Sequence, residues 1–292
     1  MVIYELSKRF PQLCLKPEKG VSQSELYKSI VRRGEQYSGS LSHFKGTEED
    51  SLTTVETPAG KVETVFLRNR EDFECFYQIM AGKCEPVPVL RSVGASYIGG
   101  INDWSKIRAH MDEYERNGGT DTDDEFRRFT SDKNNYKTSI ILLSDGFYSN
   151  ISCENTPFCR DEWLRISFEI RKYHELTHFV CRRLFPEKIV PVWDELLADF
   201  YGLLCATGAY DRNLALSFLG INEGKYTQGR LEQYAEGRIN DTLVGEIVEL
   251  MGTLEELAPE NFSRDEDDFR TVISLQKDSE KILEGFSLVR KI

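Results

Sequence analysis

The feature that most constrains the fold of this chain is a pair of helical segments, 161–185 and 192–208, separated by only six residues. Phe185 and Pro186 are expected to end the first helix, and Gly208 closes the second. Because the link is so short, the second helix is predicted to run back antiparallel to the first. The sequence therefore predicts a helical hairpin whose two inner faces meet.

The first helix carries two of the four histidines of the chain, His174 and His178, in the stretch "RKYHELTHFV". At 100° per residue both histidines fall on the apolar side of the helix with Trp163 and Ile170, away from most of its charged residues. Residues four apart are neighbours about 6 Å apart, so both imidazoles can reach one metal ion. Glu175 lies about 100° round from His174, where it can reach a metal-bound water without occupying a coordination position.

The second helix has a broad apolar stripe and, opposite it, the carboxylates Glu195 and Asp199. Their neighbours on that side are small residues, Ala198, Gly202 and Ala206, which allow another helix to approach closely. Two buried carboxylates are unfavourable unless a cation accompanies them. We therefore expect Glu195 to be the third metal ligand and Asp199 to accept the free N–H of a ligating imidazole.

The motifs H-E-x-x-H in "HELTH" and E-x-x-x-D in "DELLAD" resemble the gluzincin zinc metallopeptidases, the group that includes the thermolysin family. The resemblance covers about 35 residues of the 292 in the chain. It implies zinc bound by His174, His178 and Glu195, with Glu175 as general base and acid and Asp199 orienting His174. It also implies that substrate lies along the edge strand of a sheet, for which residues 146–152 are the nearest match.

The chain departs from the thermolysin-like pattern after the zinc motif. Those enzymes use a later histidine and a tyrosine to stabilise the oxyanion, but no histidine follows His178. Arginine or tyrosine can donate to a developing alkoxide, so Tyr226, Arg230 and Tyr234 are the candidates for this role, with ordinary surface positions as the alternative.

The expected fold class is α+β and zincin-like, with the zinc site between two lobes. Residues 1–155 are predicted to form a mixed α/β lobe with a small substrate-side sheet, and residues 156–292 a mostly helical lobe that carries the zinc ligands. Within the first lobe, 51–67 is predicted to be a β-hairpin and 138–152 a strand, a tight turn and a second strand. The polar, Asp-rich segment 118–137 is expected to be a mobile surface loop.

Composition limits the possible partners and compartment. A net charge of −12 disfavours binding to nucleic acids and to anionic membrane surfaces. The seven cysteines are scattered and are expected to be reduced. Without a membrane-length apolar run or a secretory signal, the protein is expected to be soluble and cytoplasmic.

The sequence thus predicts a zinc-dependent metallopeptidase, a hydrolase that cleaves peptide bonds in a peptide or protein substrate. A first alternative is a non-catalytic zinc-containing binding or regulatory protein with a vestigial peptidase site. A second is a deformylase-like amide hydrolase, in which Cys153 or Cys159 would be the third ligand. Cleavage specificity and oligomeric state are left open.

Overall fold

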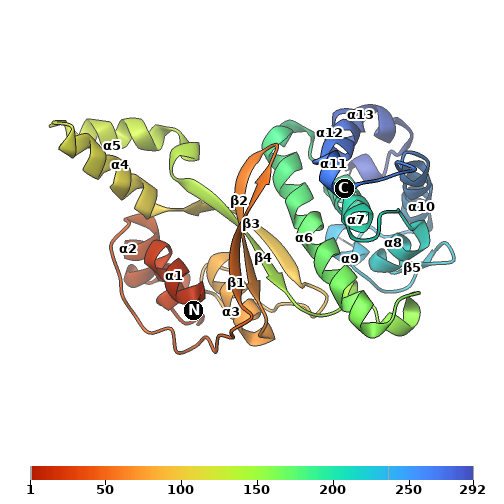
Figure 1. The fold of residues 1–292 in the computed structure, drawn as a ribbon, viewed down its shortest axis with the longest axis horizontal. Coiled ribbons are helices and arrows are strands. Elements are labelled where there is room, and N and C mark those ends of the chain that lie inside the picture. Colours follow the sequence, from red (N-terminus) through yellow and green to blue (C-terminus); the bar gives the residue numbers. More distant parts are fainter. Residues whose placement is uncertain (1, 236, 292) are drawn as a thin grey trace. The chain divides into compact units, whose positions relative to one another are not determined.

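The computed structural model describes residues 2–235 and 237–291 and has an α+β fold (Figure 1). The first half contains α1 (Val2–Arg9), α2 (Glu25–Arg32), β1 (Ser51–Thr57), β2 (Gly60–Leu67), α3 (Arg70–Met80), β3 (Ala95–Asn102), α4 (Trp104–Arg116), α5 (Thr122–Ser131) and β4 (Lys137–Ser144). The second half contains α6 (Arg160–Leu184), α7 (Pro191–Thr207), α8 (Arg212–Leu219), β5 (Ile221–Asn222), β6 (Lys225–Tyr226), α9 (Leu231–Tyr234), α10 (Asp241–Glu256), α11 (Arg264–Asp267), α12 (Arg270–Lys277) and α13 (Ser279–Ile282).

The main sheet has four strands in the order β1-β2-β4-β3. The predicted hairpin at 51–67 is present as β1 and β2. Strands β2 and β4 pair in parallel, from Glu63 opposite Ile140 to Leu67 opposite Ser144. Most of β4 is buried, as its apolar "SIILL" run predicts, whereas β3 was not anticipated from the sequence and lies at an edge of the sheet.

The chain divides into two compact units. The sheet unit comprises residues up to Thr54, Val62–Val89 and Ile98–Ser144, and the helical unit comprises Val55–Lys61, Leu90–Tyr97 and the residues from Asp145 onward. The predicted boundary near 155 falls between β4 and α6. The helical unit therefore also includes three stretches that precede this boundary in the sequence: Val55–Lys61, Leu90–Tyr97 and 145–154.

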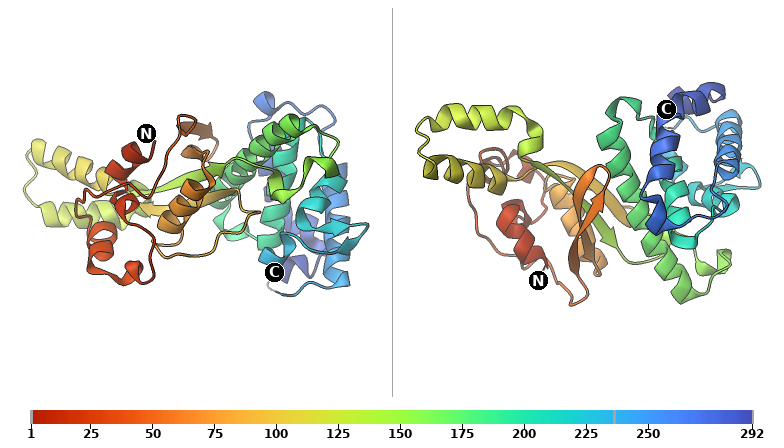
Figure 2. Two further views of the ribbon diagram at one scale, coloured as in Figure 1. Left: turned by 90° about the horizontal axis from the view of Figure 1, so that it is seen from below. Right: turned by 45° about the horizontal axis from the view of Figure 1, so that its top comes forward.

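The expectation of a mobile loop at 118–137 is wrong, because α5 occupies the middle of this segment. Asp121 caps the helix by accepting a hydrogen bond from the amide of Asp124, and acidic residues fill the first turn, where the helix dipole favours them. Helix α5 lies beside α4, where Glu125 contacts the ring of His110 at 2.5 Å (Figures 1 and 2). The Asp-rich composition thus marks a helix start rather than a loop.

The second strand expected within 146–152 is also absent. Ser149 and Asn150 have φ of 50° and 60°, in the left-handed region, which is incompatible with an extended strand. The segment instead forms a turn of 3₁₀ helix, Tyr148–Asn150. The proposed match between 146–152 and an edge strand is therefore wrong.

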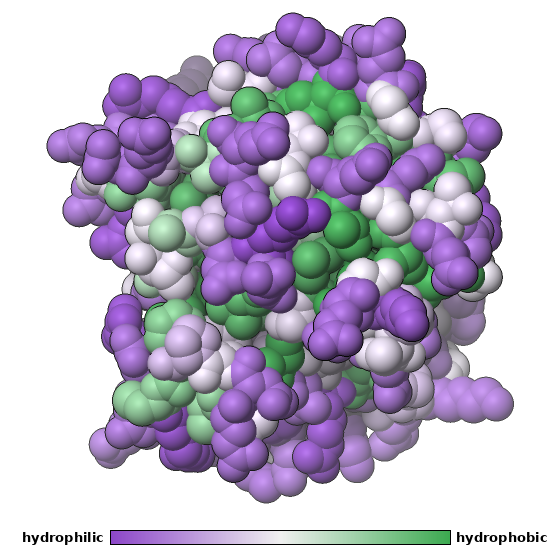
Figure 3. All heavy atoms as spheres, turned by 90° about the vertical axis from the view of Figure 1, so that its right-hand side faces the viewer, coloured by the Kyte–Doolittle hydropathy of each residue, from purple (hydrophilic) through white to green (hydrophobic). Residues whose placement is uncertain are grey.

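The helical unit has an aromatic and aliphatic core centred on α6 and α7. Trp163, Trp193, Phe179 and Phe200 are each at most 1% exposed. The side of this unit seen in Figure 3 is largely hydrophilic, with smaller apolar areas between the polar side chains. None of the helices among the described residues combines the length and the apolar character of a bilayer span.

Candidate metal centre

Helix α6 turns His174, Glu175 and His178 inward. The exposed fractions of these residues are 5%, 7% and 4%. The helix is long, with acidic side chains in its first turn and basic ones in its last, a distribution that the helix dipole favours. The predicted inward direction of both imidazoles is confirmed.

Helix α7 packs antiparallel against α6 at very short range. A Cβ atom at Gly202 would lie 2.9 Å from the carbonyl oxygen of Ile170, closer than side-chain carbons approach in folded proteins. Further along α6, His178 faces Glu195, which precedes Gly202 on α7, so the two helices run in opposite directions. Gly208 ends α7 in the left-handed conformation with φ of 80°, as predicted.

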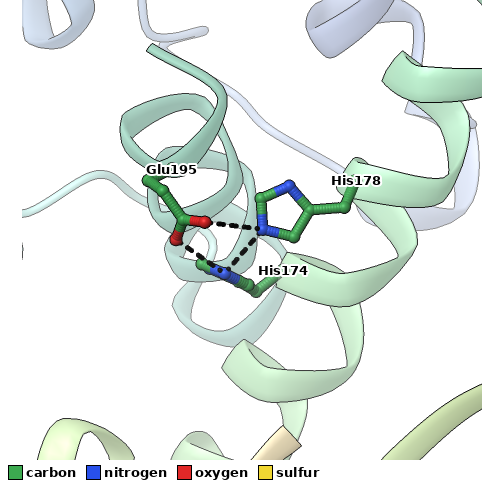
Figure 4. A group of neighbouring side chains, drawn as sticks. All are labelled: His174, His178 and Glu195. Carbon is green, nitrogen blue, oxygen red and sulfur yellow. Dashed lines mark hydrogen bonds and ion pairs between the residues drawn. The ribbon is translucent and has the colours of Figure 1, made fainter. Parts of the chain in front are cut away.

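Three side chains from these two helices point toward one another (Figure 4). Their ligand atoms all lie within 4.8 Å of one another. Nε2 of His174 is 3.4 Å from Oε2 of Glu195, Nε2 of His178 is 3.4 Å from Oε1, and the two Nε2 atoms are 3.0 Å apart. Ligands held tetrahedrally by zinc at 2.0–2.2 Å would be about 3.3–3.6 Å apart, so the two 3.4 Å distances match one zinc ion and the 3.0 Å distance is slightly shorter.

The Nδ1 atoms of the two histidines each lie close to a carboxylate, which affects the protonation of the rings. Nδ1 of His174 is 2.8 Å from Oδ1 of Asp199, and Nδ1 of His178 is 2.8 Å from Oδ2 of Asp194. An ionised carboxylate only accepts hydrogen bonds, so each carboxylate favours the tautomer with the hydrogen on Nδ1, and a ring that is neutral then has its lone pair at Nε2. Two lone pairs and the Glu195 carboxylate then converge, an arrangement that could hold a cation.

The pKa shifts agree with a site that attracts positive charge. Burial alone would lower the pKa of His178, but Asp194 and Glu195 raise it well above its usual value. Burial alone would raise the pKa of Glu195, but the two histidines hold it well below its usual value. The protein therefore stabilises positive charge at this point, as either protons or a metal ion.

Asp199 is the centre of a buried network that includes Tyr148, a residue the sequence did not single out. The Tyr148 hydroxyl donates to Asp199 Oδ1 at 2.6 Å and lies 3.0 Å from His174 Nδ1. Arg230 donates to Asp199 Oδ2 and, at 2.9 Å, to the Tyr148 oxygen. Burial alone would raise the pKa of Asp199, but Arg230 and the hydrogen bond from His174 hold it below its usual value. Asp199 is thus kept ionised where it orients His174.

Asp194 is the second functional residue that sequence reasoning missed. It lies beside Nδ1 of His178 and accepts a hydrogen bond from Arg182 at 2.9 Å. The local signal was its place directly before Glu195 in "WDELLAD". Each histidine therefore has its own supporting carboxylate, and each carboxylate its own arginine.

Glu175 lies beside the first residues of β3. The backbone N–H of Tyr97 donates to Oε2 of Glu175 at 2.6 Å, and the Tyr97 ring packs edge-on against Phe179. Strand β3 is an edge of the sheet, and Tyr97 belongs to the part of it that is grouped with the helical unit. Oε2 of Glu175, the candidate base, is thus fixed by a hydrogen bond from the backbone of Tyr97.

The three oxyanion candidates lie in different surroundings. The Tyr226 hydroxyl accepts from the amide of Gly229 at 3.1 Å within a local turn. Arg230 is 8% exposed and is bound to Asp199. Tyr234 interacts with the carboxylate of Glu195, and burial is the main reason that its pKa lies well above its usual value. The charge of Glu195 contributes to raising the pKa of both Tyr234 and Arg230, so both lie near this candidate metal ligand.

Neither Cys153 nor Cys159 belongs to the cluster of His174, His178 and Glu195, the group among residues 2–235 and 237–291 that could hold a metal ion. Cys153 is half-buried and Cys159 is exposed. The geometry favours the carboxylate over a cysteine as third ligand.

A family model described as a family of unknown function, DUF7005, matches residues 2–290. Comparison with curated proteins and with solved structures gave no match.

Proposed function

Since the chain belongs to DUF7005, a family whose function is unknown, its activity has to be argued from its site, and we propose that it is a zinc-dependent metallopeptidase. His174, His178 and Glu195 would hold the zinc ion. The single observation that carries this proposal is the convergence of two imidazole lone pairs and a carboxylate, each histidine being fixed by a further carboxylate.

Three protein ligands leave a fourth tetrahedral position for water or substrate, which is typical of catalytic rather than structural zinc. When bound there, zinc would activate a water molecule and polarise the scissile carbonyl. Glu175 accepts the proton of the attacking water and delivers it to the leaving amine. The hydrogen bond from Tyr97 N–H to Oε2 orients this carboxylate and leaves Oε1 for the proton.

Tyr234 is the group best placed to stabilise the oxyanion. The charge of Glu195 is among the causes that raise the pKa of Tyr234, so this tyrosine lies near a candidate metal ligand. A tyrosine hydroxyl can turn from that carboxylate to a developing alkoxide and donate to it. Arg230 donates hydrogen bonds to Asp199 and Tyr148, so its proposed role is to position these residues and not to contact the oxyanion.

A peptide in extended conformation is the substrate that suits an exposed sheet edge. An edge strand offers unpaired backbone groups that can pair with an added strand. We assign this role to the Ala95–Tyr97 end of β3, which is grouped with the helical unit and where Tyr97 contacts the candidate base. The site so arranged would hydrolyse peptide bonds.

The proposal is tested by the metal content and by cleavage. We expect one zinc ion per chain in protein purified without added metal, measured by elemental analysis. The triple variant His174→Ala, His178→Ala, Glu195→Ala should contain none, and full zinc content in this variant would refute the site. Cleavage is sought by mass spectrometry of a diverse peptide library incubated with zinc-loaded protein.

A second candidate function is a zinc-containing binding protein. It is favoured by the absence of any histidine after His178 and by the engagement of Glu175 with the β3 backbone. Peptides that bind to the zinc-loaded protein and are never cleaved would select this alternative.

A further inference from the structure

A polar pocket of about 650 Å³ lies in the helical unit. Four separate segments form it: 90–92, 149–155, 217–218 and 228–233. The volume is within the range of about 300–1,000 Å³ that is usual for pockets binding small ligands or side chains.

The wall of this pocket is made mostly of uncharged hydrogen-bonding groups. Four serines and four asparagine or glutamine residues line it, and its charged groups are two arginines and one glutamate. The polar lining includes Arg91, Ser149, Gln228 and Arg230. In a chain with a net charge of −12, such a wall is unusually poor in carboxylates.

Two buried polar atoms on this wall have no hydrogen-bond partner within the described part of the chain. They are Oγ of Ser149 and Nε of Arg230. Each outer nitrogen of Arg230 donates one hydrogen bond, to Tyr148 or to Asp199, whereas its Nε–H has no partner among the described residues. A buried donor left unpaired is unfavourable, which favours a ligand that brings an acceptor oxygen.

The pocket and the metal centre share residues. Arg230 lines the pocket and binds Asp199, which in turn contacts His174. Helix α9 lines the pocket with Gln233 and interacts with Glu195 through Tyr234. The pocket is therefore linked to the candidate metal centre through Arg230 and α9.

We propose that this pocket selects the substrate, by receiving a residue next to the scissile bond whose side chain ends in a carboxamide or carboxylate. The inference rests on the proposed peptidase function. The side-chain oxygen accepts hydrogen bonds from Ser149 and Arg230 as the loop and the guanidinium adjust around it. An apolar side chain would leave Oγ of Ser149 and Nε of Arg230 without partners, and a cationic one would face Arg91 and Arg230.

The test uses binding, so it does not depend on turnover. The probes are four dipeptide hydroxamates, in which the hydroxamate anchors on zinc and the adjacent residue is Gln, Glu, Leu or Lys. Dissociation constants are measured by calorimetry with zinc-loaded wild-type protein. We expect the Gln and Glu probes to bind at least about tenfold more tightly than the Leu and Lys probes, which is the effect of one or two added hydrogen bonds.

Two variants connect the preference to the pocket. Ser149→Gly removes the hydroxyl, and glycine tolerates the φ of 50° at this position without strain. Gln228→Ala removes an exposed pocket side chain, so that folding is not at risk. Each should reduce the preference for Gln and Glu at least threefold. The exposed Ser274→Ala, which is not part of the pocket lining, is the control and should leave it unchanged.

The possible failures separate the two proposals. Equal affinity for all four probes, or a preference that survives both variants, would overturn the pocket assignment and leave the metal centre intact. If no hydroxamate binds to protein that contains zinc, the open coordination position is refuted, and the pocket assignment falls with it.

Discussion

The three carboxylates of the candidate centre differ in which histidine nitrogen they face, and this difference sets their expected roles. Glu195 faces the two Nε2 atoms and is placed to bind the metal, whereas Asp194 and Asp199 face the Nδ1 atoms. A carboxylate at Nδ1 fixes the tautomer and makes Nε2 a better metal ligand. The identity of each acid therefore matters less than its position relative to the two rings.

The two supporting carboxylates should each affect metal affinity. Replacing Asp199 with Asn, or Asp194 with Asn, should weaken zinc binding by about 10- to 100-fold without abolishing it, because the tautomer is no longer fixed by charge. Replacing Glu195 with Gln should weaken it more. Competition with a chelator of known affinity measures all three. Unchanged affinity in the Asp199 and Asp194 variants would mean that these acids serve only packing.

Glu175 is expected to be needed for turnover and not for metal binding. Glu175→Gln keeps the size and the hydrogen-bonding capacity but removes the base, so the rate should fall by about 10² to 10⁴. Zinc content and peptide binding should be retained. The comparison is made at equal zinc content on a peptide that the wild type cleaves, and equal rates would exclude Glu175 as the base.

Tyr234 should affect the rate more than substrate binding. Loss of its hydroxyl in Tyr234→Phe should lower kcat by about 10- to 1,000-fold, the range for an oxyanion donor, with KM nearly unchanged. Tyr226→Phe is the matched control, because the Tyr226 hydroxyl bonds within its own turn. A similar loss in both variants would point to a general effect on the fold.

At the scale of elements, the centre depends on how closely α6 and α7 approach. Gly202 has no Cβ atom, so α7 can approach the backbone of Ile170 more closely than any other residue at 202 would allow. This contact lies one to two turns along α6 from His174 and on the same pair of helices as Glu195. Gly202 is not itself a candidate ligand, but through the spacing of the two helices it helps to set the distances among the ligand atoms of His174, His178 and Glu195.

Adding one methyl group at this contact should be harmful. Gly202→Ala should lower the free energy of unfolding by about 1–3 kcal/mol, because the helices must move apart to admit the Cβ atom. Zinc affinity should fall with it. Denaturant unfolding and chelator competition measure the two effects.

The matched control for this substitution lies in α10. Gly245 is exposed and helical, with no atom within 4 Å of a built Cβ. Gly245→Ala should raise the free energy of unfolding by up to about 1 kcal/mol, since alanine favours the helix more than glycine does. If both substitutions stabilise the protein, the close approach at Gly202 is not important.

For the whole molecule, bound zinc should stabilise the fold. The ligands come from two helices of one core, so an unfolded chain cannot hold them together. Zinc at about 1,000 times its dissociation constant would add about 4 kcal/mol to the free energy of unfolding. Adding a chelator should therefore lower the thermal midpoint of the wild type and leave that of the triple ligand variant unchanged. An equal response in both proteins would contradict a specific site.

The sequence by itself determined the helical hairpin and the inward direction of His174 and His178. These follow from local rules: 3.6-residue periodicity, helix-ending residues and the short link between the helices. The same rules failed at 118–137, because aspartates at a helix start resemble those of a loop, and at 146–152, where left-handed residues interrupt the strand.

Only the tertiary structure decided which residues complete the centre. Tyr148 meets Asp199 from 51 positions away, Tyr97 meets Glu175 from 78, and Arg230 meets Tyr148 from 82. No local pattern encodes such contacts, because they depend on how distant segments pack and on the need of each buried polar group for a partner. The spacing of residues along one helix is a property of the sequence, whereas the partners of those residues are a property of the fold.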